Sequence, residues 1–289
     1  MTVARSNWGD ADEIGARNLV DGAATLRGVA AVQSGQVIPL ALLIEPGKPA
    51  PAADIRPPIQ HFMTRDGGDY AAGLPERFGF GFTDDVIILP THGTTHIDAL
   101  SHVLCSGKIY NGYSSDTITS KGAHRCGIEK LDPIVTRGLF VDLVPPEGTQ
   151  LPHAITSEML QAAVQSTGVV PEPGDALLVR TGWLQQWREG NATPYSTTGL
   201  HHDCADWIIE QGFVMVAADN VAVEVLPSHD PDCAVPLHIR LIQENGIYLA
   251  ELFDLEKLAM AGQASFQFMI APLRIKGGVG SPITPVAIL

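Results

Sequence analysis

Apolar and polar positions in the second half of the chain follow two alternating periods. Short apolar runs predict strands at residues 139–143, 175–181, 213–218, 247–253 and 266–271. Between them, a helical period predicts helices at residues 156–166, 202–211, 236–244 and 255–260. Thr156 can cap the first of these helices, because its hydroxyl can accept a hydrogen bond from a backbone N–H of the first turn. This repeated alternation predicts an α/β fold.

The first half of the chain has fewer helical signals and is rich in glycine, which favours additional β structure. A helix is expected at residues 21–33, and the V-I-I-L run at residues 86–89 predicts a strand. The helix would place Leu26, Val29, Ala30 and Val32 on its apolar side. The segments richest in Pro, Gly or Asp are short enough to be loops, so we expect one domain over residues 1–289; they are 45–58, 64–75 and 145–153.

The densest chemistry lies in T-H-G-T-T-H-I-D-A-L-S-H-V, residues 91–103. On a helix, Asp98 would point about 200° away from His96. On an extended chain, alternate side chains share a face, so His92, His96 and Asp98 would converge, and Gly93 would let the backbone approach an ion closely. Two imidazoles and a carboxylate suit zinc, manganese or iron. His102 follows where the strand is expected to turn into a helix, and it is an acid/base, a further ligand or a hydrogen-bond donor to Asp98.

A second polar anomaly occurs in I-Y-L-A-E-L-F, residues 247–253. Strand alternation puts Glu251 on the same face as Ile247, Leu249 and Phe253, and a carboxylate among apolar neighbours needs a cationic partner. That partner is a metal ion, or else the residue forms a salt bridge or faces water. His238, in the preceding helix, could reach the same end of the sheet. Glu224 and Asp219, near another strand end, are candidates for orienting such ligands.

Composition and charge indicate which classes of binding partner the chain is not expected to have. Lys and Arg number 18 against 32 Asp and Glu, a net charge of −14 that disfavours nucleic acid and anionic membrane surfaces. No apolar stretch approaches the length of a membrane span, residues 1–10 do not resemble a secretory signal, and the four scattered cysteines form no C-x-x-C pair. We therefore expect a cytoplasmic protein. Only 17% of residues are charged and the mean hydropathy is +0.12, which suggests oligomerisation.

Other motifs are weaker. His201 and His202 are adjacent, and since adjacent side chains diverge on a helix they are not expected to serve one ion. Phe78, Phe80 and Phe82 share one face of an extended F-G-F-G-F segment, which predicts core packing or the wall of an aromatic pocket. The loop at residues 64–75 is a candidate for setting substrate specificity.

With these residues in place, the chain resembles the metal-dependent cyclase family that includes bacterial kynurenine formamidase and isatin hydrolase. The family signature is H-x-G-T-H-x-D-x-P-x-H, and this chain has H-G-T-T-H-I-D-A-L-S-H at residues 92–102, with Thr94 and Leu100 replacing the Gly and the Pro. Weaker collinear matches extend the resemblance over nearly the whole length, at residues 7–9, 12–18, 107–112, 174–183, 219–224, 238–251 and 280–282.

The resemblance implies a swivelling β/β/α fold, commonly dimeric, and a site carried over by position. His92, His96 and Asp98 would ligate a first metal. Asp98 would bridge to a second metal held by His238 and Glu251, and His102 would be the acid/base. Family members use two zinc ions or a single manganese, so one or two Zn²⁺ or Mn²⁺ ions per chain are expected.

The leading functional hypothesis is a metal-dependent hydrolase of an amide, formamide or lactam, acting on a small, aromatic or cyclic substrate with no nucleic acid or membrane partner. Such an enzyme is expected to be a homodimer or a higher homo-oligomer. The first alternative is a lactone hydrolase or a polyketide-type cyclase that uses the same ion as a Lewis acid. The second is a metal-stabilised binding or structural protein, whose site would be closed to solvent.

Overall fold

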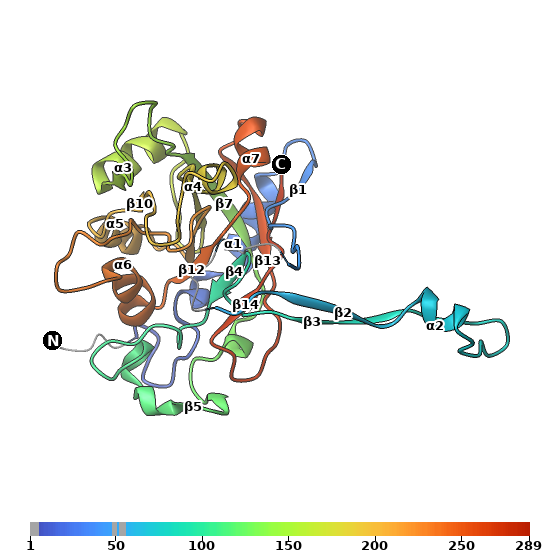
Figure 1. The fold of residues 1–289 in the computed structure, drawn as a ribbon. Helices are drawn as coiled ribbons and strands as arrows, with labels where there is room; N and C mark the ends of the chain where they lie inside the picture. Colours follow the sequence, from blue (N-terminus) through green and yellow to red (C-terminus); the bar gives the residue numbers. More distant parts are fainter. Residues whose placement is uncertain (1–5, 48–50, 52–55) are drawn as a thin grey trace.

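The computed structural model describes residues 6–47, 51 and 56–289. Its centre is a nine-stranded mixed sheet with the order β1-β15-β13-β7-β9-β11-β12-β4-β14 (Figure 1). The four middle strands β7, β9, β11 and β12 run parallel, and antiparallel strands flank them on both sides. Their bounds are β1 Val37–Pro39, β4 His96–Asp98, β7 Ile134–Asp142, β9 Ala176–Arg180, β11 Met215–Ala218, β12 Tyr248–Glu251, β13 Ser265–Ile270, β14 Gly280–Pro282 and β15 Val286–Ile288.

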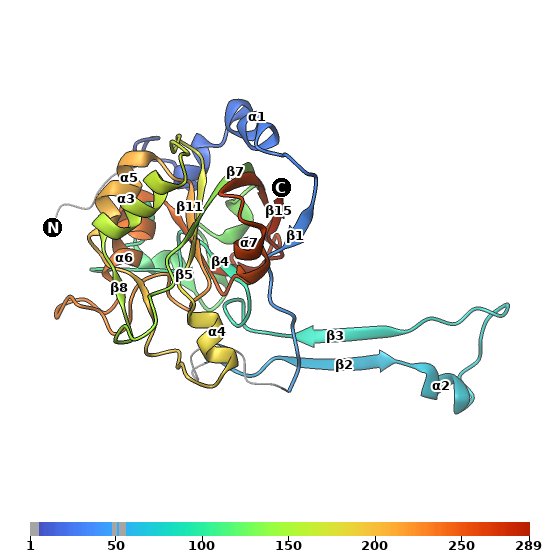
Figure 2. The same cartoon turned by 90° about the horizontal axis from the view of Figure 1, so that it is seen from above.

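Helices connect and cover these strands. They are α1 Gly22–Ala30, α2 Gly67–Ala71, α3 Ser157–Ser166, α4 Trp183–Arg188, α5 Cys204–Gln211, α6 Pro236–His238 and α7 Glu256–Ala261, with short 3₁₀ turns at Gly15–Leu19, Tyr110–Gly112, Ser115–Thr117 and Ile128–Lys130. A π-helical stretch, Ile239–Gln243, continues α6. In both views α3, α5 and α6 lie together on one side, while α1 packs against β7 and β13 (Figures 1 and 2).

This arrangement confirms the predicted α/β class and every predicted strand and helix of the second half. Thr156 caps α3 as expected, accepting a hydrogen bond from the backbone N–H of Met159 at 3.4 Å. Buried apolar side chains from Ala16 to Leu289 join in one large cluster. The swivelling β/β/α arrangement and the single domain over residues 1–289 stay predictions.

The helix predicted at 21–33 forms as α1, but its predicted apolar side is wrong. Leu26 and Val29 are 68% and 48% exposed, whereas Ala24 and Gly28 face the core. The reason is close approach: a Cβ at Gly28 would overlap the backbone of Thr136 on β7. Small residues therefore let this helix lie directly on the sheet, and the larger apolar side chains point outward.

A long arm extends from the body of the molecule in both views (Figures 1 and 2). It consists of β2 Gln60–Arg65 and β3 Asp84–Ile88, which pair only with each other, and α2 near its far end. The strand predicted at 86–89 is therefore real, but it is exposed along its length. Phe78, Phe80 and Phe82 are exposed near the tip, so both interpretations of that stripe, core and pocket wall, are wrong for the chain by itself.

The loop predicted at 64–75 contains α2 and lies along the outer part of the arm, away from the body of its own chain (Figure 2). Two more strand pairs complete the secondary structure of the described residues: β5 Ile118–Thr119 with β6 Gly122–Ala123, and β8 Ala154–Ile155 with β10 Gly199–Leu200. All four cysteines are free thiols. Among the described residues, no helix is long and apolar enough to cross a membrane.

Candidate metal centre

Strand register brings the first carboxylates and imidazoles together. β4 lies between β12 and β14, with His96 directly opposite Glu251 and Asp98 opposite Gly280. Directly opposite residues of an antiparallel pair point to the same face, and so do residues two apart on one strand. His96, Asp98 and Glu251 therefore share one buried face at the carboxyl end of β12, where ligands commonly bind in α/β sheets.

His92 reaches this face by a different route from the one expected. The extended segment is only His96–Asp98; His92 and Gly93 lie in the turn before it, where the N–H of Gly93 donates to the carbonyl of Pro90. Gly93 is packed against Pro90, which accounts for its small size without any ion. The Nε2 atom of His92 nevertheless lies 3.2 Å from Oδ1 of Asp98.

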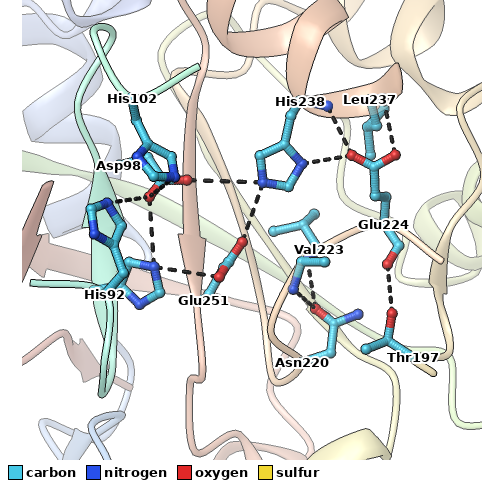
Figure 3. Close-up of polar contacts among 12 residues, drawn as sticks. His92, Asp98, His102, Thr197, Asn220, Val223, Glu224, Leu237, His238 and Glu251 are labelled. Atoms are coloured by element: carbon cyan, nitrogen blue, oxygen red, sulfur yellow. Dashed lines mark hydrogen bonds and ion pairs between the residues drawn. The ribbon is translucent and has the colours of Figure 1, made fainter. Parts of the chain in front are cut away.

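His238 enters from the opposite side, from the end of α6. Its Nε2 lies 3.3 Å from Oε1 of Glu251 and 4.0 Å from Oδ2 of Asp98 (Figure 3). Its Nδ1 lies 2.6 Å from Oε1 of Glu224, which also accepts the backbone N–H of His238, while Oε2 accepts that of Leu237. A carboxylate that accepts from Nδ1 leaves the Nε2 lone pair free to face the centre.

The same logic fixes the orientation of His96. Its Nδ1 donates to the carbonyl of Thr94 at 2.8 Å, so Nε2 carries the lone pair and faces Glu251 Oε2 at 3.3 Å and Asp98 Oδ1 at 3.6 Å. Both imidazoles thus turn an electron pair towards carboxylate oxygens. That arrangement is repulsive unless a proton or a cation lies between the two groups.

Several atoms at the centre are buried and have no hydrogen-bond partner. They are Nε2 of His92, Nε2 of His96 and both carboxylate oxygens of Asp98. Buried polar atoms are almost always paired, so their convergence fits a bound cation. Two groups of three could hold one: His92, His96 and Asp98, and Asp98, His238 and Glu251, with ligand atoms within 4.8 Å of one another in each group. Asp98 is common to both.

The electrostatics agree with this fit. Burial opposes a charge on Asp98, but the imidazoles of His102, His92 and His96 outweigh it and lower the pKa of this carboxyl. Burial likewise opposes a proton on His238, yet Glu224 and Glu251 raise its pKa well above the usual value. The chain alone therefore favours an ionised Asp98 and a protonated His238, and a divalent ion would replace that proton.

His102 lies at the edge of the cluster. The helix expected at this point is absent: His102 is in a turn, with its N–H donating to the carbonyl of Ala99. Its side chain is 29% exposed, its Nε2 lies 3.9 Å from Oδ1 of Asp98, and its ring stacks on that of His92 at 4.1 Å between centroids. Burial, with the neighbouring His92 and His238, lowers the pKa of His102 to about 4 against the opposing effect of Asp98. The ring is therefore neutral at pH 7 and can accept a proton.

A turn after β11 holds Glu224 in place. Asn220 Oδ1 accepts the backbone N–H groups of Ala222 and Val223, and Thr197 donates its hydroxyl to the carbonyl of Glu224 at 2.9 Å (Figure 3). Val223 has a φ of +56°, a left-handed conformation that is unusual for a β-branched residue. Such strain persists only where the surroundings enforce it, and it is common next to functional sites.

The structure therefore brings together all six residues singled out in the sequence, and it adds two whose role at the centre was missed, Gly280 and Thr91. Gly280 leaves room for His92, since a Cβ there would overlap the imidazole, and Thr91 Oγ1 lies 3.0 Å from Nδ1 of His92. The register of β14 against β4, which carries the Gly280 signal, is invisible in the sequence. His201 and His202, by contrast, lie outside both groups of three.

A pocket of about 480 Å³ opens beside the centre. Gly93 and Thr94, which directly follow His92, form part of its wall, but none of the six clustered residues lines it. The rest of the lining combines apolar side chains, among them Leu42, Ile59, Leu184 and Trp187, with the charged side chains of Glu45 and Arg188. An organic group could therefore bind next to the turn that carries His92.

Comparison with known proteins agrees with the resemblance seen in the sequence. A solved structure described as a novel cyclase is 34% identical and covers 98% of each chain, with a TM-score of 0.89. The isatin hydrolase of Roseibium aggregatum is 24% identical over 211 residues, 70% of this chain and 73% of that protein. A crystal structure of an isatin hydrolase bound to the product analogue thioisatinate shares the fold at 19% identity, with a TM-score of 0.67 over 93% of this chain and 99% of that one. The model of the family described as "Putative cyclase" matches residues 38–225, well over half of the sequence, and the chain therefore belongs to this cyclase family.

Proposed function

We propose that this chain is a metal-dependent hydrolase that cleaves an amide, formamide or lactam bond in a small aromatic or cyclic substrate. The observation that carries the proposal is the convergence of unpartnered, buried atoms of His92, His96 and Asp98. Similarity to an isatin hydrolase supports hydrolysis, and the solved complex with thioisatinate supports a cyclic or aromatic substrate. The pocket beside the centre, with Leu42, Leu184 and Trp187 in its wall, suits the organic part of such a molecule.

In this proposal His92, His96 and Asp98 hold one ion, and Asp98 also reaches a second held by His238 and Glu251. Imidazole and carboxylate ligands suit Zn²⁺ and Mn²⁺. When bound, such an ion supplies a Lewis acid that polarises a carbonyl group and lowers the pKa of a water molecule towards about 7.

His102 is the proposed acid/base. Its lowered pKa leaves the ring neutral at neutral pH, so one ring nitrogen can accept a proton, and its partial exposure lets it meet both water and substrate. Nε2 takes the proton that the attacking water loses and returns it to the departing nitrogen. Asp98, 3.9 Å away, stabilises the imidazolium between these two transfers.

A second candidate, favoured by the family description, is cyclisation or lactone hydrolysis at the same centre. Hydrolysis, whether of an amide or of a lactone, differs from cyclisation in the fate of water. Incorporation of ¹⁸O from labelled water into the product marks hydrolysis, whereas ring closure of a linear substrate releases unlabelled water or none.

The first test is the metal content of chain purified without chelator, measured by inductively coupled plasma mass spectrometry. About two ions per chain would support the site bridged by Asp98, and formamides would be screened first. About one ion, especially manganese, would direct the screen to lactams. A chain that takes up neither Zn²⁺ nor Mn²⁺ on reconstitution would refute the proposal.

A further inference from the structure

The helix α4 forms part of the wall of the pocket beside the metal centre. Leu184 and Trp187, one turn apart on this helix, both line the pocket. Trp183 and Leu184 pack with Leu252 in a small apolar cluster that is separate from the main core, and Trp187 packs against the same cluster. The position of α4 therefore sets the shape of the pocket, although this helix is not anchored in the main core.

The start of α4 is held by a carboxylate from another strand. Asp219, which directly follows β11, accepts hydrogen bonds from the backbone N–H groups of Thr181 at 2.7 Å and Gly182 at 2.9 Å. It also accepts one from the Thr181 hydroxyl at 2.7 Å. The same hydroxyl oxygen accepts the N–H of Trp183, the first residue of the helix, at 3.2 Å. Asp219 thus fixes the turn between β9 and α4.

This turn is matched to an ionised carboxylate. Oδ1 of Asp219 accepts the two hydrogen bonds from Thr181, and Oδ2 accepts the one from Gly182. Asp219 is fully buried, and burial raises its pKa to about 6 against the opposing effect of these three donors. A buried polar group is costly unless it is hydrogen-bonded, and here all three donors depend on the position of the turn. An amide in place of the carboxylate would set its NH₂ group against an N–H donor.

The next residue along the chain acts on the metal centre instead. Asn220 accepts a hydrogen bond from the N–H of Val223 at 2.6 Å and so holds the turn that carries Glu224 (Figure 3). Glu224 in turn orients the imidazole of His238. Two successive residues at the end of β11 therefore reach two different parts of the site, Asp219 the pocket wall and Asn220 the metal centre.

We propose that Asp219 is a positioning residue for substrate binding, which holds α4 so that Leu184 and Trp187 form the wall of a pocket for an aromatic group. The inference rests on the proposed function in one respect, that this pocket receives the organic part of the substrate. From the sequence, Asp219 was a candidate for orienting metal ligands. In the structure its three hydrogen bonds go to the turn before α4 instead.

The first test is fluorine NMR of the full chain with its four tryptophans replaced by 5-fluorotryptophan and assigned by Trp→Phe variants. Trp183 and Trp187 lie on α4, with their rings stacked at 5.6 Å between centroids, whereas Trp207 lies on α5. Asp219→Asn should shift or broaden the signals of both α4 residues and leave that of Trp207 unchanged. Asp175→Asn, the same change at an equally buried carboxylate, should leave both α4 signals unchanged.

The second test is binding of indole, a neutral aromatic probe, to the metal-free chain, followed by the signal of Trp187. Indole should shift this signal in wild type. Its dissociation constant should rise at least about fivefold in D219N, as expected for the loss of one hydrogen bond. Metal affinity of D219N should be unchanged. Glu224→Gln should have the opposite effect, with weaker metal binding and unchanged indole binding. Since indole binding is measured without metal, a failure of the hydrolase proposal would be seen separately.

Unchanged α4 signals in D219N would overturn the proposal, and so would an unchanged affinity for indole. Indole that leaves the Trp187 signal of wild type unmoved would overturn the assignment of the pocket to an aromatic group. Equal shifts of the α4 signals in D219N and D175N would show a general effect of neutralising a buried carboxylate, and would also refute the proposal. If circular dichroism shows that D219N does not fold, Thr181→Val removes one of the three hydrogen bonds and keeps the size of the side chain. That variant should shift the same two signals, and their constancy would refute the proposal.

Discussion

Replacing Glu224 by Gln should weaken metal binding although Glu224 is not itself a proposed ligand. Its carboxylate accepts three hydrogen bonds, from the backbone N–H groups of Leu237 and His238 and from Nδ1 of His238. Gln retains the shape but has one acceptor oxygen and one NH₂ group. Either the imidazole or the start of α6 must then face a donor instead of an acceptor.

The expected loss follows from these contacts. A hydrogen bond to a charged group contributes about 1.5–3 kcal/mol and a neutral one about half of that, so the substitution costs roughly 1–2 kcal/mol at the imidazole. Every 1.4 kcal/mol is a factor of about ten in an equilibrium constant. Metal affinity should therefore fall about 5- to 30-fold, which overlaps the roughly 10- to 100-fold loss usual on removing a partner of a metal-binding histidine.

The assay is titration of metal-free chain with Zn²⁺ and Mn²⁺ in competition with a chelator of known affinity. Asp175→Asn is the matched control: Asp175 is a fully buried carboxylate, but it pairs with Arg27 and Arg137, outside the centre. This control should lower stability in urea and leave metal affinity unchanged. Affinity of E224Q within twofold of wild type would show that Glu224 does not orient His238.

Three further substitutions separate ligands, acid/base and packing. Asp98→Ala should abolish metal binding in mass spectrometry, because both groups of three share this residue, and full occupancy would rule out its role as a ligand. His102→Ala should keep its metal but lose about 10²–10⁴-fold in kcat once a substrate is found, and loss of metal in this variant would instead make His102 a ligand. Gly280→Ala should lower metal affinity at least about tenfold by displacing the ring of His92, with the thermal midpoint of the metal-free chain nearly unchanged. A large fall in that midpoint would mean that Gly280 matters for folding and not for the centre.

Much of the body could be predicted because its signals are local. The strands and helices after residue 134 follow from apolar periodicity, and the spacing of His96 and Asp98 follows from strand alternation. The arm could not be predicted, because V-I-I-L has the same pattern whether its strand is buried or exposed. The buried side of α1 was also beyond periodicity, since close approach of Gly28 to Thr136 depends on a contact between distant parts of the chain.

In the candidate site too, local sequence signals predicted some features, whereas contacts between distant segments determined others. Spacing predicted the convergence of His92, His96 and Asp98, the family resemblance supplied the full set of six, and Glu224 was also suspected. The tautomers of His96 and His238 could not be foreseen, because each depends on what Nδ1 meets in three dimensions, the carbonyl of Thr94 or the carboxylate of Glu224. The same holds for the space that Gly280 leaves beside His92.

The position of β4 between β12 and β14 has a consequence for biosynthesis. A strand from the first half of the chain is inserted between two strands from the last quarter, so a growing polypeptide lacks Glu251 and the β14 edge until synthesis is nearly complete. A nascent or truncated chain would therefore have no complete cage for an ion. Metal uptake would then indicate that the whole sheet has formed. An ion bound by residues of both β4 and β12 would link these distant segments, and it would have to dissociate before they could separate.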